Sequence, residues 1–468
     1  MRVDNNICDD ADSYKHTHHL QYPKDTKFIH SYLESRHDAS NAFTVFYGLQ
    51  MVLLENLVGE VVTQEKIDEA AENSMGEFGH ALFNKAGWEY ILNEHKGKLP
   101  VEIRAVPEGL ITPSRNVLVT VENTDENVPW LTNYLETILL HVWYPTTVAT
   151  NSYRIRALID KYAIESGTRV TPYHVHDFGF RGASSAQTAG YGGSAHLINF
   201  LGSDTRIARR YAKTFYNAKN EGLSSSIYAA EHSTVTMYGR DNELEAYRNI
   251  IDNANKDFPM ACVSDSYNHW IAVEDYFGQA LKDKILARNA KTVVRPDSGN
   301  PIEVSDKTIT MLMKYYGFTT NDLGYKTLNP KIGVIYSDRI CEDVIKNILE
   351  RIVKRQKYTT DNIVFGIGGA LLQQVNRDTY KFAFKASAGY INDEWRDIKK
   401  TVVTEPMKES KAGRLKLIVD EETGKYKTVN IDADGSDVLK TVFKNGKLIK
   451  KHTFEEIRRR AGWKDYYG

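Results

Sequence analysis

Short apolar stretches alternate with segments of helical periodicity between about residues 170 and 385, and this alternation constrains the fold more than any other feature. Repeated strand–helix units predict a parallel sheet. Polar residues or glycines follow each predicted strand, at the end where barrels and open α/β sheets place their active sites. The predicted strands are residues 260–264, 292–294, 333–336, 362–365 and 382–384, and the predicted helices are about 268–287, 305–316 and 341–355, with another starting near Leu371.

The two ends of the chain have a different pattern. Residues 42–57 and 130–163 carry apolar residues at helical spacing, and Pro145 is expected to kink or break the second helix. Strands are predicted at 101–106, 117–121 and 414–419, with a hairpin turn at 421–425 and a helix at 454–462. We therefore predict a mixed β/α domain built from residues 1–150 and 386–468, and an α/β barrel-like catalytic domain over residues 151–385.

The composition excludes several classes of protein. The formal net charge of the 468 residues is -1, so there is no overall basic field of the kind that nucleic-acid binding requires. No window approaches the roughly 20 apolar residues of a membrane span, and the polar first fourteen residues predict no signal peptide. The widely spaced Cys8, Cys262 and Cys341 predict neither a disulfide framework nor a zinc site, which favours a reducing cytoplasm.

Residues 176–234 hold the densest group of chemically useful side chains. The stretch opens with HDFGFRG at 176–182, continues through glycine-rich residues 189–196, and ends with AAEHST at 229–234. Glycines allow a ligand to approach the backbone closely, and Phe178 beside Arg181 offers a flat face next to a cation. The combination predicts a pocket for a flat ring and a phosphorylated partner. His232, after Glu231, would take part in chemistry or would be a structural histidine.

Two strand-end loops are candidate phosphate sites. In RPDSGNP at 295–301, Arg295 would bind phosphate and Asp297 would hold a metal or orient a base, although an Asx or type I turn explains the same residues. In FGIGG at 365–369, backbone N–H groups at a helix start would bind phosphate, although a tight turn also needs glycine. A basic group follows, which is either a phosphate cradle or a solvated face: Arg377, Lys385, Lys399, Lys400, Lys408, Lys411 and Arg414.

Near the N-terminus, residues 12–15 (DSYK) allow two interpretations. Tyr14 would stack in the pocket of a neighbouring subunit, or it would anchor a helix that Asp12 caps. The spacing of His16, His18 and His19 fits no common metal site, so these side chains are predicted to lie on the surface, or at most to contact residues that themselves bind a ligand.

Taken in order, the motifs resemble the nicotinamide phosphoribosyltransferase family over nearly the whole chain. Each motif is short, but the ordered set is highly specific. It comprises DSYK at 12–15, HDFGFRG at 176–182, TAGYGGSAHLINF at 188–200, AAEHST at 229–234, VSDSY at 263–267, RPDSGNP at 295–301, FGIGG at 365–369, FKNGK at 443–447 and FEEIRR at 454–459.

This resemblance implies an activity and a fold. Members of that family condense nicotinamide with 5-phosphoribosyl 1-pyrophosphate (PRPP), giving nicotinamide mononucleotide and pyrophosphate in NAD salvage. The implied fold is that of a type II phosphoribosyltransferase, an irregular α/β barrel with a second, mostly β domain. The resemblance also implies a homodimer with sites at the subunit interface, Mg²⁺ with the pyrophosphate, and ATP that phosphorylates an active-site histidine.

It further implies a role for each matching residue. Phe178 and Tyr14 of the partner subunit would sandwich the pyridine ring, with Arg181 near the ring. Asp204 would accept a hydrogen bond from the carboxamide and repel a nicotinate carboxylate. His232 would be the phosphorylated histidine, with Glu231, Asp265 and Asp297 around it. Arg295 and Asp338 would hold the ribose and its neighbours, and Gly368 and Gly369 would take the 5′-phosphate. The phosphate sites would be completed, in part from the other subunit, by Arg377, Lys385, Lys400 and Lys408.

Two positions depart from the family pattern. Ser337-Asp338-Arg339 stands where Gly-Asp-Gly is expected, so Arg339 would either contact phosphate or block it. Ala383 replaces a serine, which would remove one hydroxyl contact worth about 1 kcal/mol. The alternatives are a nicotinate phosphoribosyltransferase, a catalytically silent protein that binds pyridine nucleotides or phosphates, and an unrelated barrel enzyme acting on a phosphorylated sugar, which would need neither Asp204 nor Tyr14.

Overall fold

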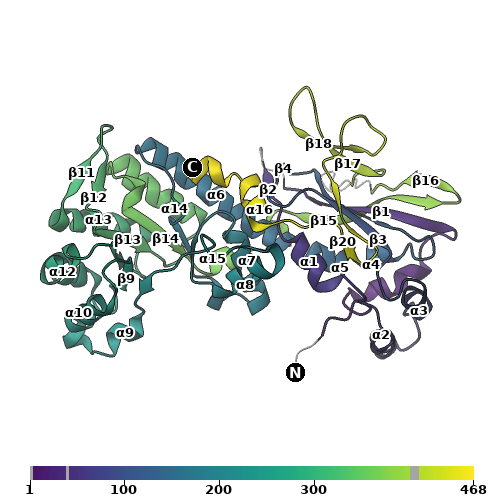
Figure 1. Cartoon of the computed structure of the whole chain (residues 1–468), viewed down its shortest axis with the longest axis horizontal. Coiled ribbons are helices and arrows are strands. Elements are labelled where there is room, and N and C mark those ends of the chain that lie inside the picture. The colour runs from purple at the N-terminus through teal and green to yellow at the C-terminus, as the bar shows by residue number, and fades with distance from the viewer. Residues whose placement is uncertain (1–3, 38–41, 401–409, 468) are drawn as a thin grey trace. The chain divides into compact units, whose positions relative to one another are not determined.

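The computed structural model describes residues 4–37, 42–400 and 410–467, and the chain divides into two compact units (Figure 1). Unit 1 comprises residues 1–150, 215–217 and 376–461, and unit 2 comprises residues 151–214, 218–375 and 462–468. Three segments thus differ from the predicted division: residues 215–217, 376–385 and 462–468. Residues 376–385 join unit 1, because strand β15 (Phe382–Ile391) pairs antiparallel with β1 (Thr26–Ser35). The last residues join unit 2, where the Tyr467 hydroxyl donates to the Asn199 carbonyl at 2.6 Å.

Unit 2 is built on the parallel sheet that the strand–helix alternation predicts. Every pair of neighbouring strands in it is parallel. The segment 225–229 links the two edges of this sheet: Ser225 bridges to Gly202 at one edge, and β8 pairs with β9 at the other. The sheet therefore curls into a barrel. The strand order is β7 (Gly202–Ser203), β6 (Val175–Asp177), β14 (Ile363–Ile367), β13 (Ile332–Tyr336), β10 (Thr292–Arg295), β9 (Met260–Val263) and β8 (Tyr228–Ala229).

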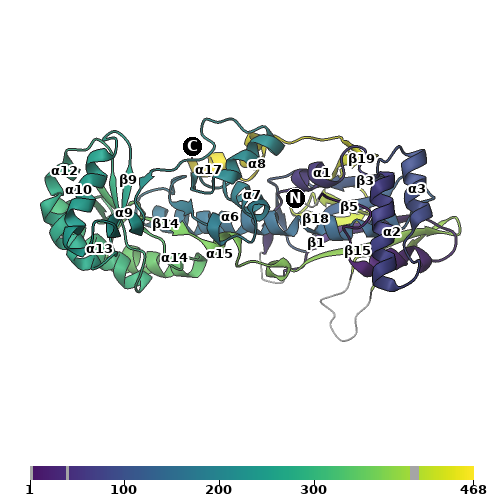
Figure 2. The same ribbon diagram turned by 90° about the horizontal axis from the view of Figure 1, so that it is seen from below.

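Helices cover the outside of this sheet (Figure 2). Their starts follow ordinary capping rules: Asn300 accepts hydrogen bonds from the backbone of Ile302 and Glu303, and Pro301 occupies the first helical position of α13. The predicted helix at 268–287 instead contains a π-helical stretch, Ala272–Ala280. The main helices are α6 (Trp143–Glu165), α7 (Ala186–His196), α8 (Arg206–Tyr216), α10 (Glu243–Asn253), α13 (Pro301–Tyr316) and α14 (Glu342–Leu349).

Inside the barrel, small and branched side chains from neighbouring strands pack together. Ala261, Val293 and Ile335 are buried, and Phe178 and Val364 pack against them. This apolar layer closes the barrel interior beneath the carboxyl ends of the strands, so the polar residues at those ends stand on a packed floor.

Unit 1 contains a seven-stranded antiparallel sheet. Its central strands are the most apolar, with Leu33, Ile103 and Val121 fully buried. Helices α2 (Gln64–Phe78) and α3 (Lys85–Glu94) belong to the same unit. The strand order is β16 (Glu394–Asp397), β15, β1, β5 (Val117–Asn123), β3 (Val101–Ala105), β19 (Lys440–Lys444) and β20 (Lys447–Leu448), which confirms the strands predicted near 101–106 and 117–121.

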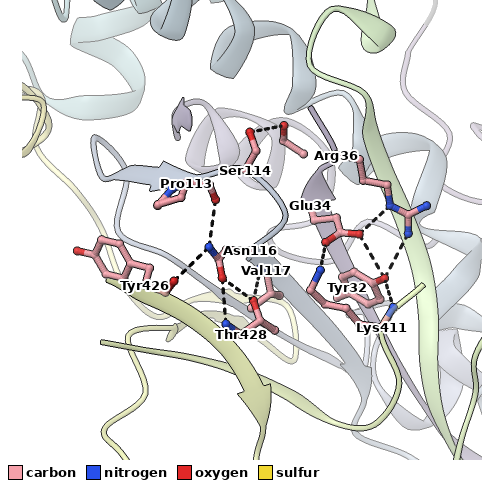
Figure 3. Close-up of polar contacts among 11 residues, drawn as sticks. Tyr32, Glu34, Arg36, Pro113, Ser114, Asn116, Val117, Lys411, Tyr426 and Thr428 are labelled. Atoms are coloured by element: carbon pink, nitrogen blue, oxygen red, sulfur yellow. Dashed lines mark hydrogen bonds and ion pairs between the residues drawn. The ribbon is translucent and has the colours of Figure 1, made fainter. Parts of the chain in front are cut away.

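A network around a buried carboxylate ties the end of β1 to the C-terminal part of unit 1 (Figure 3). Glu34, whose side chain is 2% exposed, accepts from Arg36 Nε at 2.7 Å and forms an ion pair with Lys411 Nζ. The Tyr32 hydroxyl accepts from the Lys411 backbone N–H at 2.8 Å. Because Glu34 is so buried, removing its charge would leave two cations without a counter-ion, at a typical cost of about 3 kcal/mol.

The predicted hairpin consists of β17 (Leu415–Val419) and β18 (Tyr426–Asn430), and Asn116 joins it to β5 (Figure 3). The Asn116 amide donates to the Tyr426 carbonyl and accepts from the Thr428 backbone N–H at 2.9 Å, while Thr428 Oγ1 accepts from Val117 N. A side-chain amide can form hydrogen bonds with backbone N–H and C=O groups in this way where two neighbouring strands are not joined by backbone hydrogen bonds.

Two local predictions are wrong, each for a physical reason, and the prediction for Pro145 is confirmed. The apolar run 42–57 is not one helix: β2 (Phe43–Val45) precedes α1 (Leu49–Asn56), because Gly48 adopts a left-handed conformation (φ 104°) between them. The predicted helix at 130–163 is indeed interrupted next to Pro145: α5 (Glu136–Leu140) ends, and α6 begins at Trp143 with Pro145 in its first turn, where its missing N–H costs nothing. His16 is not on the surface: it is buried, and its ring lies 5.3 Å from Phe83.

A candidate active site at the carboxyl ends of the barrel strands

The predicted site residues of unit 2 gather at one end of the barrel. Because parallel strands all present their carboxyl ends at the same edge, residues far apart in sequence meet there. Phe178 follows β6, Asp204 follows β7, Glu231 and His232 follow β8, Asp265 follows β9, Arg295 and Asp297 end and follow β10, Asp338 follows β13, and Gly368 and Gly369 follow β14.

Asp204 is held as a carboxylate by two donors. His176 Nε2 and Ser226 Oγ both lie within hydrogen-bond distance of Asp204 Oδ1, at 3.0 and 2.5 Å. Burial raises the pKa of Asp204, but the hydrogen bonds from His176 and Ser226 outweigh burial and hold it below its ordinary value, and Arg295 acts in the same direction. Asp204 therefore presents a negative charge at the rim of the barrel.

The Phe178 ring is placed by its neighbours on β6 and β14. Its centroid lies 4.8 Å from that of His176, and its backbone N–H donates to the Ile367 carbonyl at 2.8 Å. A Cβ on Gly366 would stand 2.4 Å from Phe178 Cε2, so glycine is required for the ring to lie there. Arg181 is exposed in the short turn Phe180–Gly182.

Arg295 places a guanidinium with one unpaired N–H donor at this end of the barrel. Its Nε is buried and has no hydrogen-bond partner among the described residues. Burying a charged donor without a partner is costly, so the guanidinium is available to an anionic or carbonyl ligand.

His232 lies in a hydrogen-bonded relay. Its Nε2 is 3.2 Å from Asp265 Oδ1, and Ser298 Oγ donates to Asp265 Oδ2 at 2.5 Å. The Asp265 side chain is 7% exposed and that of His232 is 46% exposed. Glu231 accepts from the hydroxyl of Ser233, the second residue of the following helix α9 (His232–Thr236). The buried carboxylate thus orients an accessible imidazole.

Asp297 and Asp338 follow neighbouring strands. Ser337 Oγ donates to Asp297 Oδ1 at 2.6 Å, so the serine that replaces the expected glycine supports a site carboxylate. Arg339 adopts a positive φ of 52°, and its side chain is 89% exposed, with Nε 3.6 Å from Asp338 Oδ2. The arginine therefore takes the backbone conformation that favours glycine while its side chain points into solvent.

The glycine loop after β14 leaves open space. A Cβ added at Gly368 or Gly369 would meet nothing within 4 Å. Gly369 is the first residue of the short helix α15 (Gly369–Leu372). The loop therefore leaves room beside its backbone at the start of a helix, as phosphate binding requires.

The remaining predicted residues belong to unit 1. Tyr14 and Lys385 line one cavity of about 410 Å³ together with Lys15, His18 and Glu136. Burial lowers the pKa of Lys385, and the nearby cations Arg36, Lys15 and Arg377 lower it further. Lys400 pairs through its backbone with Ser410, and Lys408 lies outside the described residues. This unit thus offers a second group of cations around an aromatic ring.

Sequence reasoning missed residues that matter in this geometry. Ser226 carries no sequence signal of its own, and only the closing segment 225–229 brings it to Asp204. Asp177 is fully buried, accepts from the Gly179 N–H at 2.7 Å, and has its pKa raised to about 6 by burial. Its place inside the HDFGFRG motif was a signal that it matters, but the motif does not distinguish a residue that supports the loop from one that binds a ligand.

The described residues do not form a metal site from protein side chains alone. Among them, no group of three or more His, Cys, Asp or Glu side chains is arranged to hold an ion. Nor does any helix among those residues have the length and apolar character to cross a membrane.

Comparisons with known proteins agree with this geometry. A model described as the nicotinate phosphoribosyltransferase (NAPRTase) family matches residues 173–447, and one for the N-terminal domain of nicotinamide phosphoribosyltransferase matches residues 6–103. The chain is 42% identical to a nicotinamide phosphoribosyltransferase of Xanthomonas campestris pv. campestris, covering 98% of this chain and 99% of that protein. It is 31% identical to a protein of the same name from Acinetobacter baylyi, covering 96% and 95%.

Two solved structures share the fold. A nicotinate-nucleotide pyrophosphorylase from Pyrococcus furiosus superposes with a TM-score of 0.63 at 16% identity, covering 99% of this chain and 97% of that one. Human nicotinic acid phosphoribosyltransferase superposes with a TM-score of 0.57 at 16% identity, covering 98% and 94%. The predicted fold, an irregular α/β barrel with a second, mostly β domain, is confirmed.

Proposed function

Since the chain belongs to the nicotinate phosphoribosyltransferase family, we propose that it transfers the phosphoribosyl group of PRPP to nicotinamide, releasing pyrophosphate and forming nicotinamide mononucleotide for NAD salvage. One observation carries the choice of nicotinamide. Asp204 stands at the barrel rim as a carboxylate, where it accepts a carboxamide N–H and repels the carboxylate of nicotinate. The names of the two similar bacterial proteins point the same way.

The ring is bound between aromatic and polar groups. The Phe178 face supports the pyridine, Asp204 accepts from the amide, and Arg295 supplies its unpartnered donors to the carbonyl or to the ribose. Arg181 stands nearby in its exposed turn. Because the pyridine nitrogen of nicotinamide is already nucleophilic, these groups orient the ring and no base is needed to activate it.

The reaction is driven by charge stabilisation at the departing pyrophosphate. Breaking the bond from the ribose carbon to pyrophosphate creates positive charge on the ribose and negative charge on the leaving group. The backbone N–H groups of Gly368 and Gly369, beside the open space at this loop, would hold the 5′-phosphate, and the carboxylates of Asp297 and Asp338 would face the ribose.

The carboxylates also fit Mg²⁺. This ion binds through one or two carboxylates plus substrate phosphates, and Asp297 and Asp338 follow the adjacent parallel strands β10 and β13. Bound Mg²⁺ neutralises charge on the pyrophosphate. Ser337 orients Asp297 through its 2.6 Å hydrogen bond.

ATP stimulation through a phosphohistidine is part of the proposal. Asp265 engages His232 through Nε2, which leaves Nδ1 as the nitrogen that would attack the γ-phosphate of ATP. The N–P bond would form as ADP leaves, and the added charge would organise Mg²⁺ and pyrophosphate. Incubation with γ-labelled ATP should give an acid-labile, alkali-stable phosphoprotein, and the His232→Ala variant should give none.

A homodimer is also proposed. The unit 1 cavity, with Tyr14 and Lys385 on its wall, would supply the second ring face and further phosphate cations to the barrel of the other subunit. Mixing Tyr14→Ala with Asp204→Ala, assayed at nicotinamide well below its KM so that each variant alone is impaired, would test this: if each site draws on two subunits, mixed dimers regain one intact site and about a quarter of the parental activity, based on random pairing. No recovery, with subunit exchange shown separately, would contradict a shared site.

The deciding experiment measures product from PRPP and Mg²⁺ with nicotinamide or nicotinate, each with and without ATP. Nicotinamide mononucleotide formed in preference supports the proposal. The matched variant Asp204→Ser should shift the ratio of the two kcat/KM values toward nicotinate. Activity with nicotinate alone would favour a nicotinate phosphoribosyltransferase instead.

A further inference from the structure

The Asp204 carboxylate is bound asymmetrically. Both donors that reach it, His176 Nε2 and Ser226 Oγ, contact the same oxygen, Oδ1. No described residue forms a hydrogen bond with Oδ2, and the side chain is 42% exposed. A carboxylate held in this way offers one defined oxygen to a ligand, whereas an unrestrained carboxylate rotates about a broad, two-fold torsion.

The two donors are themselves fixed. A Cβ on Gly202 would stand 2.9 Å from His176 Nδ1, so the imidazole lies directly against the backbone of β7. Its ring centroid lies 4.8 Å from that of Phe178, with the two rings tilted by 41°. The imidazole therefore has little freedom to leave Asp204.

Ser226 is fixed by its own segment. Ser225, just before it, is held by backbone hydrogen bonds to Leu201 and Ser203, at 2.7 and 3.0 Å. Arg209 on α8, the helix that begins directly after the Asp204 loop, donates to the carbonyl and hydroxyl of Ser224 at 3.1 and 2.7 Å. The segment that closes the barrel is thus pinned to the same loop that carries Asp204.

We propose that Ser226, with His176, positions Asp204 so that Oδ2 receives the carboxamide, and that this makes Ser226 a specificity-determining residue for amide over acid. The inference rests on the proposed function. Ser226 acts through Asp204 and does not itself touch the ring, so it is a positioning residue. Without its hydroxyl, Asp204 keeps its charge and still repels nicotinate, but it binds the amide less well.

The test compares Ser226→Ala with Ser225→Ala. Both lose one hydroxyl, but the Ser225 hydroxyl forms no hydrogen bond among the described residues. For Ser226→Ala the ratio of kcat/KM for nicotinamide to that for nicotinate should fall about tenfold, the size of one charge-assisted hydrogen bond. The KM for PRPP should stay within about twofold, which a general structural defect would not allow.

A double-mutant cycle isolates the mechanism. In an Asp204→Asn background, Ser226→Ala should have no further effect on the amide-to-acid ratio, because the group it positions is already altered. Ser226→Cys keeps the side-chain volume but offers only a weak donor, so its ratio should resemble that of Ser226→Ala. Ser226 is exposed, and the thermal transition of each variant should match that of the parent.

The possible outcomes distinguish a failure of the positioning role of Ser226 from a failure of the proposed function. If the parent enzyme makes nicotinamide mononucleotide and Ser226→Ala keeps the ratio of Ser225→Ala, the positioning role is wrong and the proposed function stands. An effect of Ser226→Ala that persists in the Asp204→Asn background also overturns it. If the parent enzyme does not use nicotinamide at all, the proposed function itself fails.

Discussion

Gly369→Ala separates folding from phosphate binding at the loop after β14. Gly369 is the first residue of α15, and a Cβ there would meet no atom within 4 Å. The protein alone therefore has room for alanine. In the proposed function that room belongs to the 5′-phosphate of PRPP, which the backbone N–H groups approach closely.

The magnitude follows from the hydrogen bonds that the methyl group would obstruct. A hydrogen bond to a charged group contributes about 1.5–3 kcal/mol, and about 1.4 kcal/mol corresponds to a tenfold change in affinity. Displacing the phosphate from one N–H should therefore raise the KM for PRPP roughly 10- to 100-fold. Stability should not fall, because alanine in a helix is favoured over glycine by up to about 1 kcal/mol.

Two measurements check this expectation. Steady-state kinetics with varied PRPP gives KM, and a thermal melt gives the transition temperature. Gly76→Ala is the matched control: Gly76 lies in α2, its Cβ would also meet nothing within 4 Å, and it is remote in sequence from every predicted site residue. The control should melt at the same or a higher temperature and keep the KM of the parent.

A Gly369→Ala enzyme that folds normally and keeps the parental KM for PRPP would refute the reasoning. The space beside the loop would then not be phosphate space. A fall in the melting temperature would instead show that the helix start is packed more tightly than its geometry indicates.

Other expectations concern Tyr14, His232 and Asp177. Tyr14→Ala should raise the KM for nicotinamide up to about tenfold, the value of an aromatic pair, while Tyr14→Phe should not; an unchanged KM in both would remove the stacking role. His232→Ala should lose ATP stimulation and keep basal synthesis, and intact stimulation would rule out the phosphohistidine. Burial raises the pKa of Asp177 to about 6, above about 3.9 in the unfolded chain, so the folded state binds more protons between these values and its stability should fall as pH rises from about 4 to 6. Thermal melts of Asp177→Asn across that pH range should not show this fall in stability. A variant whose melting temperature depends on pH as that of the parent does would contradict the role of Asp177.

The sequence predicted much of the barrel and misassigned one strand. Alternation of strands and helices placed four of the five predicted strands in the parallel sheet. The fifth, at 382–384, belongs to β15 of the antiparallel sheet. A three-residue apolar stretch carries no information about its partner, so local pattern cannot distinguish the two sheets.

The same limit applies to the site. Strand-end residues such as Asp204 and Asp297 were predictable, because parallel topology brings all carboxyl ends together. The support from Ser226 and Ser337 was not, since a serine in a loop has no sequence signal until a partner is placed beside it. His16 likewise became a buried residue only when Phe83 packed against it.

By itself, the sequence determined the order of the elements, the family motifs and the chemical groups at the ends of the barrel strands, because periodicity and motif spacing are local properties of the chain. Only the tertiary structure decided which sheet β15 joins, which oxygen of Asp204 is held and which remains for a ligand, and how Glu34 neutralises Arg36 and Lys411. Those features depend on contacts between residues far apart in sequence, where burial and hydrogen-bond geometry, rather than residue type, set the energy.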